Sequence, residues 1–266
     1  MKKTTQIVTA LCLVACLANV SSAQKWGTLT MTFVYSGQRP AAVPIAVNKD
    51  VAFCGKFGLV DESLVINPKN SAIKNVVVYL RESRTKKPAV HPSYKAAMKK
   101  AVMMKLDNKQ CKFQPRVAFV ATNQKLMLSN SDKVAHNTKI DTIANEPVNP
   151  LLPAGRKLPH VFKQSEILPA VPISCAIHPW MRGYIVVRSH PYGAVSDKNG
   201  KITIKNIPVG KWTFQLWQEK AGYITKYTRN NKVKKWKRGR MKLTIKPGMN
   251  DLGTLYVGAK QFADKK

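Results

Sequence analysis

Residues 175–187 read C-A-I-H-P-W-M-R-G-Y-I-V-V, and this stretch says most about how the chain folds. Its second half, Tyr184 to Val187, is a short apolar run rich in β-branched residues, which is typical of a buried strand. Its first half places a cysteine, a histidine and a methionine within seven residues, directly before that strand. The stretch therefore predicts a loop of potential ligands that leads into a strand.

The same strand character recurs along the chain. From Thr28 to Tyr35, apolar residues alternate with threonines, as in a strand with one buried face. Continuous apolar runs follow at 76–80, 117–120 and 126–128, with turn signals between them. One short helix is expected from Ser93 to Met104, and its second half fits a strand equally well. We therefore predict an all-β protein built from β-sandwiches.

The first 23 residues predict a signal peptide. Two lysines follow Met1, residues 7–20 are apolar, and small residues precede a cleavage point after Ala23. The run L-V-A-C that ends at Cys16 also resembles a lipobox, but the apolar run continues past it to Val20, which favours ordinary cleavage. Beyond the signal, no apolar run approaches the roughly 20 residues of a transmembrane helix. We expect a periplasmic or secreted protein.

Three cysteines remain after the signal peptide: Cys54, Cys111 and Cys175. In an oxidising compartment two of them can pair. Cys54 and Cys111 have no histidine or methionine within several residues, whereas Cys175 is followed by His178 and Met181. We predict a Cys54–Cys111 disulfide and a metal-binding role for Cys175.

A second imidazole would complete a trigonal site, and His136 in V-A-H-N (134–137) provides one. One thiolate, two imidazoles and a weak axial methionine are the ligands of a blue-copper centre, since thiolate stabilises Cu(I) and imidazole suits both oxidation states. Zinc is disfavoured, because structural zinc takes four strong ligands and methionine is not one of them. We predict one type 1 copper ion held by His136, Cys175, His178 and Met181, with a metal-free domain as the alternative.

In these residues the chain resembles the cupredoxins, the blue-copper family. Two residues separate Cys175 from His178 and two separate His178 from Met181, which is similar to the amicyanin-like branch, and L-S-N-S-D-K-V-A-H-N at 128–137 matches the other ligand strand. The resemblance implies a Greek-key β-sandwich, with strong copper binding by His136 and the cysteine loop and weak binding by Met181.

The resemblance also implies roles for residues beside the ligands. Asn137 would tie the two ligand loops together, and His178 would be the ligand nearest solvent. Pro179 and Trp180 would form the apolar patch through which electrons leave.

The domain prediction follows from these motifs. Residues 24–189 are expected to form the copper domain, with 24–112 as an N-terminal β extension or, as the alternative, a separate small domain, and a boundary falls near Ser189-His190-Pro191. Residues 190–266 contain turns at 197–200 and 207–210 and resemble the carboxypeptidase regulatory-like, or transthyretin-like, sandwiches. This order of domains is similar to that of proteins labelled methylamine-utilisation-like.

The net charge of the chain limits the classes of partner that it can bind. Lysine and arginine total 45 against 13 acidic residues, a formal net charge of +32. For an exported protein this favours an acidic redox protein (a cytochrome or a dehydrogenase) or an anionic surface over nucleic acid. The basic run at 232–242, interleaved with Trp236, fits such a binding surface or simply a solvated strand face.

No motif of a hydrolase, metalloprotease, phosphate-binding loop or covalent haem site is present, so an enzyme is not expected. The sequence favours an exported copper protein that transfers single electrons. Two alternatives remain open: an exported sandwich protein that binds polyanions or surfaces, and a copper storage or delivery protein.

Overall fold

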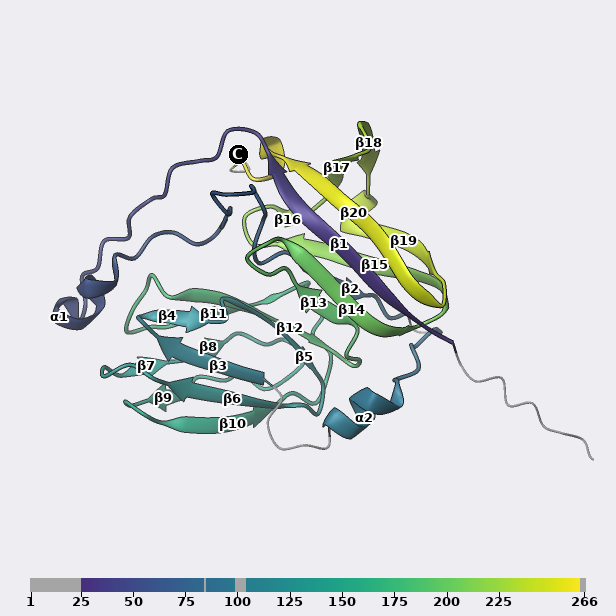
Figure 1. Cartoon of the computed structure of the whole chain (residues 1–266). Coiled ribbons are helices and arrows are strands. Elements are labelled where there is room, and N and C mark those ends of the chain that lie inside the picture. The colour runs from purple at the N-terminus through teal and green to yellow at the C-terminus, as the bar shows by residue number, and fades with distance from the viewer. Residues whose placement is uncertain (1–24, 84, 99–103, 264–266) are drawn as a thin grey trace, which may run out of the picture.

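The computed structural model describes residues 25–83, 85–98 and 104–263, so the predicted signal peptide with Cys16 and Ala23 lies outside the described residues. The described chain is nearly all β (Figure 1), which confirms the predicted fold class. Its helical segments are short: α1 (Val51–Cys54), α2 (Pro92–Met98), and the 3-10 turns η1 (Gly55–Phe57), η2 (Lys237–Gly239) and η3 (Ala259–Gln261). None of these described helices has the length and apolar content of a bilayer-crossing segment. Of the helix expected from Ser93 to Met104, the first part is present as α2, residues 99–103 lie outside the described residues, and Met104 begins a strand.

One sandwich, called here the site sandwich, is formed by residues 104–188. Its sheets have the orders β10-β6-β3-β4 and β5-β12-β11-β8, and a short pair β7-β9 lies beside them. The apolar residues of both sheets meet in one core that also holds Cys175 and Met181. The strands are β3 (Met104–Lys109), β4 (Lys112–Gln114), β5 (Val117–Ala121), β6 (Lys125–Asn130), β7 (His136–Asn137), β8 (Lys139–Ile140), β9 (Leu151–Leu152), β10 (Lys157–Val161), β11 (Val171–Ser174) and β12 (Arg182–Arg188).

The second sandwich, called here the terminal sandwich, combines both ends of the described chain. Its sheets have the orders β14-β1-β20-β17-β18 and β13-β2-β15-β16, and β19 also pairs with β15. The strands are β1 (Trp26–Ser36), β2 (Val77–Leu80), β13 (Gly193–Val195), β14 (Lys201–Pro208), β15 (Gly210–Gln218), β16 (Gly222–Tyr223), β17 (Lys226–Arg229), β18 (Lys232–Lys235), β19 (Arg240–Ile245) and β20 (Gly248–Gly258). Figure 1 shows β1 and β20, purple and yellow, side by side.

The position of β1 corrects the predicted domain boundaries. The predicted alternation is present, with Leu29, Met31, Phe33 and Tyr35 buried. That face, however, packs in the core of the terminal sandwich, and β1 pairs with β14 on one side and β20 on the other. Residues 24–112 as a whole are therefore not a β extension of the site sandwich. The site sandwich is instead inserted between β2 and β13.

Strand β2 explains how the two sandwiches pack together. All four of its residues are buried. Val78 and Leu80 enter the core of the terminal sandwich, whereas Val77 and Tyr79 pack against Val117 of β5 and other residues of the site sandwich. Because successive side chains of a strand point to opposite faces, β2 is covered on both. A strand that is buried on both faces needs apolar residues at every position, which explains the continuous apolar run of β2.

Polar contacts reinforce this packing. Arg116 of the site sandwich forms a two-bond ion pair with Glu219, with N–O distances of 2.6 and 2.7 Å. Arg188, at the end of β12, donates to the Tyr79 hydroxyl at 2.7 Å. A side chain at Gly193 would collide with the ring of Phe119, so only glycine allows this close approach.

The predicted disulfide joins Cys54 to Cys111 and is confirmed. It links α1 to the turn between β3 and β4, across 57 residues of sequence. Both sulfurs are buried in the core of the site sandwich. The segment around Cys54 therefore packs against the site sandwich, whereas β1 and β2 are strands of the terminal sandwich.

Removing this disulfide is expected to destabilise the protein substantially. Closing a loop of this length restricts the unfolded chain by about 4 kcal/mol in the chain-entropy model. A Cys54→Ala/Cys111→Ala double variant should therefore unfold at a lower urea concentration, with a free energy of unfolding lower by about that amount. Equal unfolding midpoints for the variant and the parent would contradict this expectation.

Candidate metal centre

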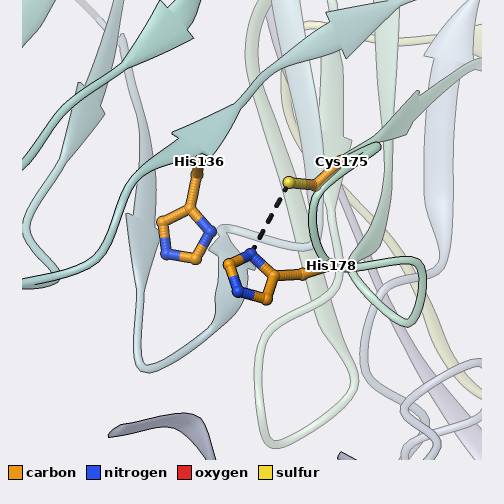
Figure 2. Close-up of side chains that lie close together, drawn as sticks. All are labelled: His136, Cys175 and His178. Atoms are coloured by element: carbon orange, nitrogen blue, oxygen red, sulfur yellow. Dashed lines mark hydrogen bonds between the residues drawn. The ribbon is translucent and has the colours of Figure 1, made fainter. Parts of the chain in front are cut away.

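Two loops at one end of the site sandwich bring the predicted ligands together. His136 lies in β7, while Cys175 and His178 lie in the turn between β11 and β12. One potential ligand atom from each of the three lies within 4.8 Å of the others, and all three residues are buried. Figure 2 shows the three side chains pointing toward one another. These residues could hold a metal ion.

His136 presents one free ring nitrogen to this cluster. Its Nε2 is 2.9 Å from Asp132 Oδ2, and its Nδ1 is fully buried with no hydrogen-bond partner among the described residues. Figure 2 shows one nitrogen of this ring facing Cys175 and His178. A buried nitrogen without a partner is costly unless another group satisfies it, and a metal ion at this point would do so.

His178 is arranged in the same way. Its Nδ1 lies 3.8 Å from Cys175 Sγ, and its Nε2 lies 2.8 Å from Asp50 Oδ2. The prediction that His178 is the ligand nearest solvent is wrong, because the residue is 0% exposed. Asp50, which belongs to the segment that precedes α1, covers its outer edge.

Asn137 links the two loops as the family resemblance implied. Its Oδ1 accepts a hydrogen bond from the Ala176 N–H at 2.7 Å and a longer one from the Ile177 N–H at 3.4 Å. The Cys175 thiol also donates to it, at 3.3 Å. Its amide nitrogen donates to Asn149 Oδ1 at 2.6 Å, which fixes the orientation of the side chain. The position of the cysteine loop relative to β7 therefore depends on this amide.

The electrostatics of the cluster favour the ligand forms of two residues. Burial raises the pKa of the Cys175 thiol, but the neighbouring His136 imidazole and nearby backbone N–H groups outweigh it, so the pKa lies below its usual value. Burial lowers the pKa of His178, and this effect outweighs the opposing hydrogen bond to Asp50. A thiolate and a neutral imidazole are the forms that bind metal ions.

His136 behaves differently. Burial lowers its pKa, but the hydrogen bond to Asp132 and the neighbouring Cys175 side chain outweigh burial and hold the pKa above its usual value. Metal ions bind the neutral imidazole, so a metal ion at this centre would have to displace a proton from His136 when the ring is protonated.

The remaining predicted site residues lie around this cluster. Met181 is 1% exposed and packs in the same core as Cys175, and its N–H donates to the His178 carbonyl at 2.9 Å. Ligation by its thioether stays a prediction. Pro179 is exposed, whereas Trp180 is half-buried and donates to the Cys111 carbonyl at 3.2 Å. An electron-exit patch at these two residues also stays a prediction.

Sequence reasoning missed two residues of this site, Asp132 and Asp50. Asp132 lies four positions before His136, inside the quoted stretch 128–137, so the local sequence did contain that signal. Asp50 is 128 residues from His178. No local pattern connects them, and only the folded chain reveals the contact.

A second group of potential ligands, Cys111, Asp132 and His136, overlaps the first. The sulfur of Cys111 is already bonded to Cys54. Asp132 accepts hydrogen bonds from the N–H groups of Gln110 and Cys111, at 2.6 and 2.8 Å. This group therefore supports His136 rather than forming another centre.

Comparison with known proteins gives no match to a family model and no match among curated proteins. Among solved structures, the chain is similar to a Cu-containing nitrite reductase from Thermus scotoductus SA-01 (21% identity, TM-score 0.29), covering 38% of this chain and 25% of that one. It is similar to a purple cupredoxin from Nitrosopumilus maritimus (21%, TM-score 0.27), covering 32% of this chain and 99% of that one. It is also similar to the reduced Cu(I) form of an amicyanin variant (17%, TM-score 0.30), covering 42% and 98%. The chain thus spans about a quarter of the nitrite reductase.

Proposed function

We propose that this chain is an exported copper protein that transfers single electrons, with one type 1 centre held by His136, Cys175, His178 and Met181. The observation that carries the proposal is the convergence of one thiol and two imidazoles in a buried cluster at the end of a sandwich. A copper ion bound there would accept and give up one electron.

The residues present fit copper for three reasons. The His136 Nδ1 atom is buried without a partner, which is the atom expected to bind a metal ion. One thiolate with two imidazoles is the donor set that suits copper in both oxidation states. The outer nitrogen of each imidazole is bonded to a carboxylate, which fixes the ring and leaves Nδ1 as the donor.

The rigidity of the site supports electron transfer rather than catalysis. Asn137 holds the cysteine loop to β7 through several hydrogen bonds. Ligands held in this way need to move little when the charge of the ion changes, which lowers the reorganisation cost of electron transfer. In this proposal no substrate binds at the centre.

A redox titration on one purified sample tests the function against copper storage or delivery. We expect one copper per chain, reduction by ascorbate and reoxidation by ferricyanide with one electron per copper, and no loss of copper over repeated cycles. Transfer of the metal to an acceptor without redox cycling would favour storage or delivery instead.

The proposed partner is an acidic redox protein that docks at the end of the site sandwich. Exposed basic residues flank the candidate ligands: Lys49 precedes Asp50, Lys133 lies three residues before His136, and Arg182 follows Met181. The basic strand pair β17–β18 belongs to the terminal sandwich, and Figure 1 shows it on the opposite side of the molecule from α1 and β7. The long basic run is therefore unsuited to docking at this centre.

The exposed lysines of β18 suggest a structural explanation for that run. All four residues of β18 are exposed, and β18 forms the edge of its sheet. Charged residues on an edge strand oppose pairing with other chains. Binding of polyanions by this strand pair remains the alternative function, and it predicts binding that survives Cys175→Ala.

Electron exchange with anions should depend strongly on salt. We expect the rate of oxidation of the reduced protein by ferricyanide to fall about tenfold or more as ionic strength rises from about 0.01 to about 1 M, because the Debye length shrinks from about 30 to about 3 Å. A cationic oxidant, tris(phenanthroline)cobalt(III), is the matched control and should show the opposite trend. The same salt dependence for both oxidants would exclude steering by the basic residues.

A further inference from the structure

Residues 43–61, called here the capping segment, form a cover fixed to the site sandwich. The two arms of the segment pair with each other: the Ile45 N–H donates to the Leu59 carbonyl at 2.9 Å, and the Asp61 N–H donates to the Val43 carbonyl at 2.8 Å. Its apolar residues pack on the core of the site sandwich, and these are Ile45, Val47, Phe53, Cys54, Phe57 and Leu59. The Cys54–Cys111 disulfide anchors its tip. Figure 1 shows α1, at this tip, beside β4.

Backbone hydrogen bonds fix the position of Asp50 in this segment. Its carbonyl accepts hydrogen bonds from the N–H groups of Phe53 and Cys54, at 2.9 and 2.8 Å. Its backbone is in the left-handed region, with φ of 47°. The carboxylate is therefore held by the same turn that ends at the disulfide, and its Oδ2 meets His178 Nε2 at 2.8 Å.

The two imidazoles of the centre differ in where their carboxylates come from. The carboxylate of His136 belongs to Asp132, in the same loop, four residues away. The carboxylate of His178 comes from the capping segment, which is a separate part of the chain. Turning the His178 ring away from the centre therefore requires breaking a contact with that segment.

We propose that Asp50 is a positioning residue for His178 and that the capping segment closes the metal centre to solvent, so that exchange of the metal requires the segment to move. This inference rests on the proposed function and adds to it the element that controls access. A carboxylate that accepts the Nε2–H fixes the tautomer in which Nδ1 binds the metal. His178 is fully buried although the next residue, Pro179, is exposed, and Asp50 of the capping segment lies against the outer nitrogen of its ring.

The first test is the rate at which an excess of chelator removes copper. Loss of a carboxylate that orients a ligand histidine typically costs about 10- to 100-fold in metal affinity, so we expect Asp50→Ala to release Cu(I) to bathocuproine disulfonate about 10- to 100-fold faster than the parent. Asp50→Asn retains a hydrogen-bond acceptor and should recover part of the difference. Asp61→Ala, at the other end of the segment and bonded to Ser63, is the matched control and should release copper at the parental rate.

The second test does not depend on copper. In the metal-free protein, long-range ¹H–¹⁵N NMR should show His178 protonated at Nε2, with that proton protected from solvent. The protection should be lost in Asp50→Ala and in the Cys54→Ala/Cys111→Ala double variant, which frees the segment. Unchanged copper release and unchanged protection in Asp50→Ala would overturn the inference.

The two tests separate this inference from the proposed function. If the parent chain binds no copper but His178 Nε2–H is protected by Asp50, the electron-carrier proposal fails and the closing role of the segment stands. If copper binds and cycles normally but Asp50→Ala behaves like Asp61→Ala, only the closing role is wrong.

Discussion

Replacing Cys175 by alanine is expected to abolish copper binding and the intense visible absorption from thiolate to copper. Cys175 is the free cysteine of the described chain, and its Sγ lies between Asn137 and His178. Without it, two imidazoles and a thioether remain, and this set lacks the thiolate that favours copper in its reduced state. The expected change is complete loss of the visible band and of stoichiometric copper.

The fold should survive this substitution. Cys175 is buried in an apolar core, and alanine is a small apolar replacement. Circular dichroism of the metal-free variant should therefore match that of the parent. Asp61→Ala is the matched control: its carboxylate is bonded to Ser63 and not to a candidate ligand, so the variant should retain the visible band. A visible band that persists in Cys175→Ala would show that the ligand assignment is wrong.

A chain of residues 190–266 alone is expected to remain unfolded, in contrast to the independent domain that its sequence predicts. In the structure, β1 lies between β14 and β20, and β2 lies between β13 and β15. Removing both strands takes an interior strand from each sheet and exposes the core residues around Phe33 and Val78. The remaining strands would lose backbone hydrogen-bond partners, and apolar area that is now buried would be exposed to water. We expect poor NMR dispersion and no cooperative thermal transition.

Deleting the inserted site sandwich, in contrast, should leave a chain that still folds. Tyr79 of β2 pairs with Gly193 of β13, and the Leu80 N–H donates to the Tyr192 carbonyl at 2.9 Å. The two ends of the inserted sandwich are therefore neighbours, so a linker of about 2–5 residues can replace 82–189. This chain should unfold cooperatively, although Val77 and Trp217 lose their cover and the capping segment loses its disulfide and the core on which it packs. Cooperative unfolding of 190–266 alone would contradict the interleaved fold.

Local sequence patterns predicted those parts of the structure that depend on neighbours in sequence. The alternation from Thr28 to Tyr35 correctly identifies the buried face of β1, and the spacing from Cys175 to His178 correctly places both in one turn. The turn at 197–200 is also confirmed: Gly200 has φ of 71°, and its N–H donates to the Asp197 carbonyl at 3.0 Å. In each case the physical cause lies within a few residues.

The errors concern which distant parts of the chain meet. An apolar strand face predicts that the face is buried, but it does not predict which sheet covers it. For this reason β1 was assigned to the wrong sandwich. The predicted exposure of His178 was wrong for the same reason. Asp50, which covers the ring, belongs to a separate segment of the chain. His136 was placed with Cys175 and His178 because a trigonal site needs a second imidazole, and the family resemblance then supported a pairing that periodicity does not contain.

The most direct measurement of the central claim is an anomalous difference map from crystals of the copper-loaded protein, recorded at the copper absorption edge. We expect a single strong peak between Cys175 Sγ and the Nδ1 atoms of His136 and His178. A peak elsewhere in the molecule, or a copper-soaked crystal with no peak among these three atoms, would contradict the account.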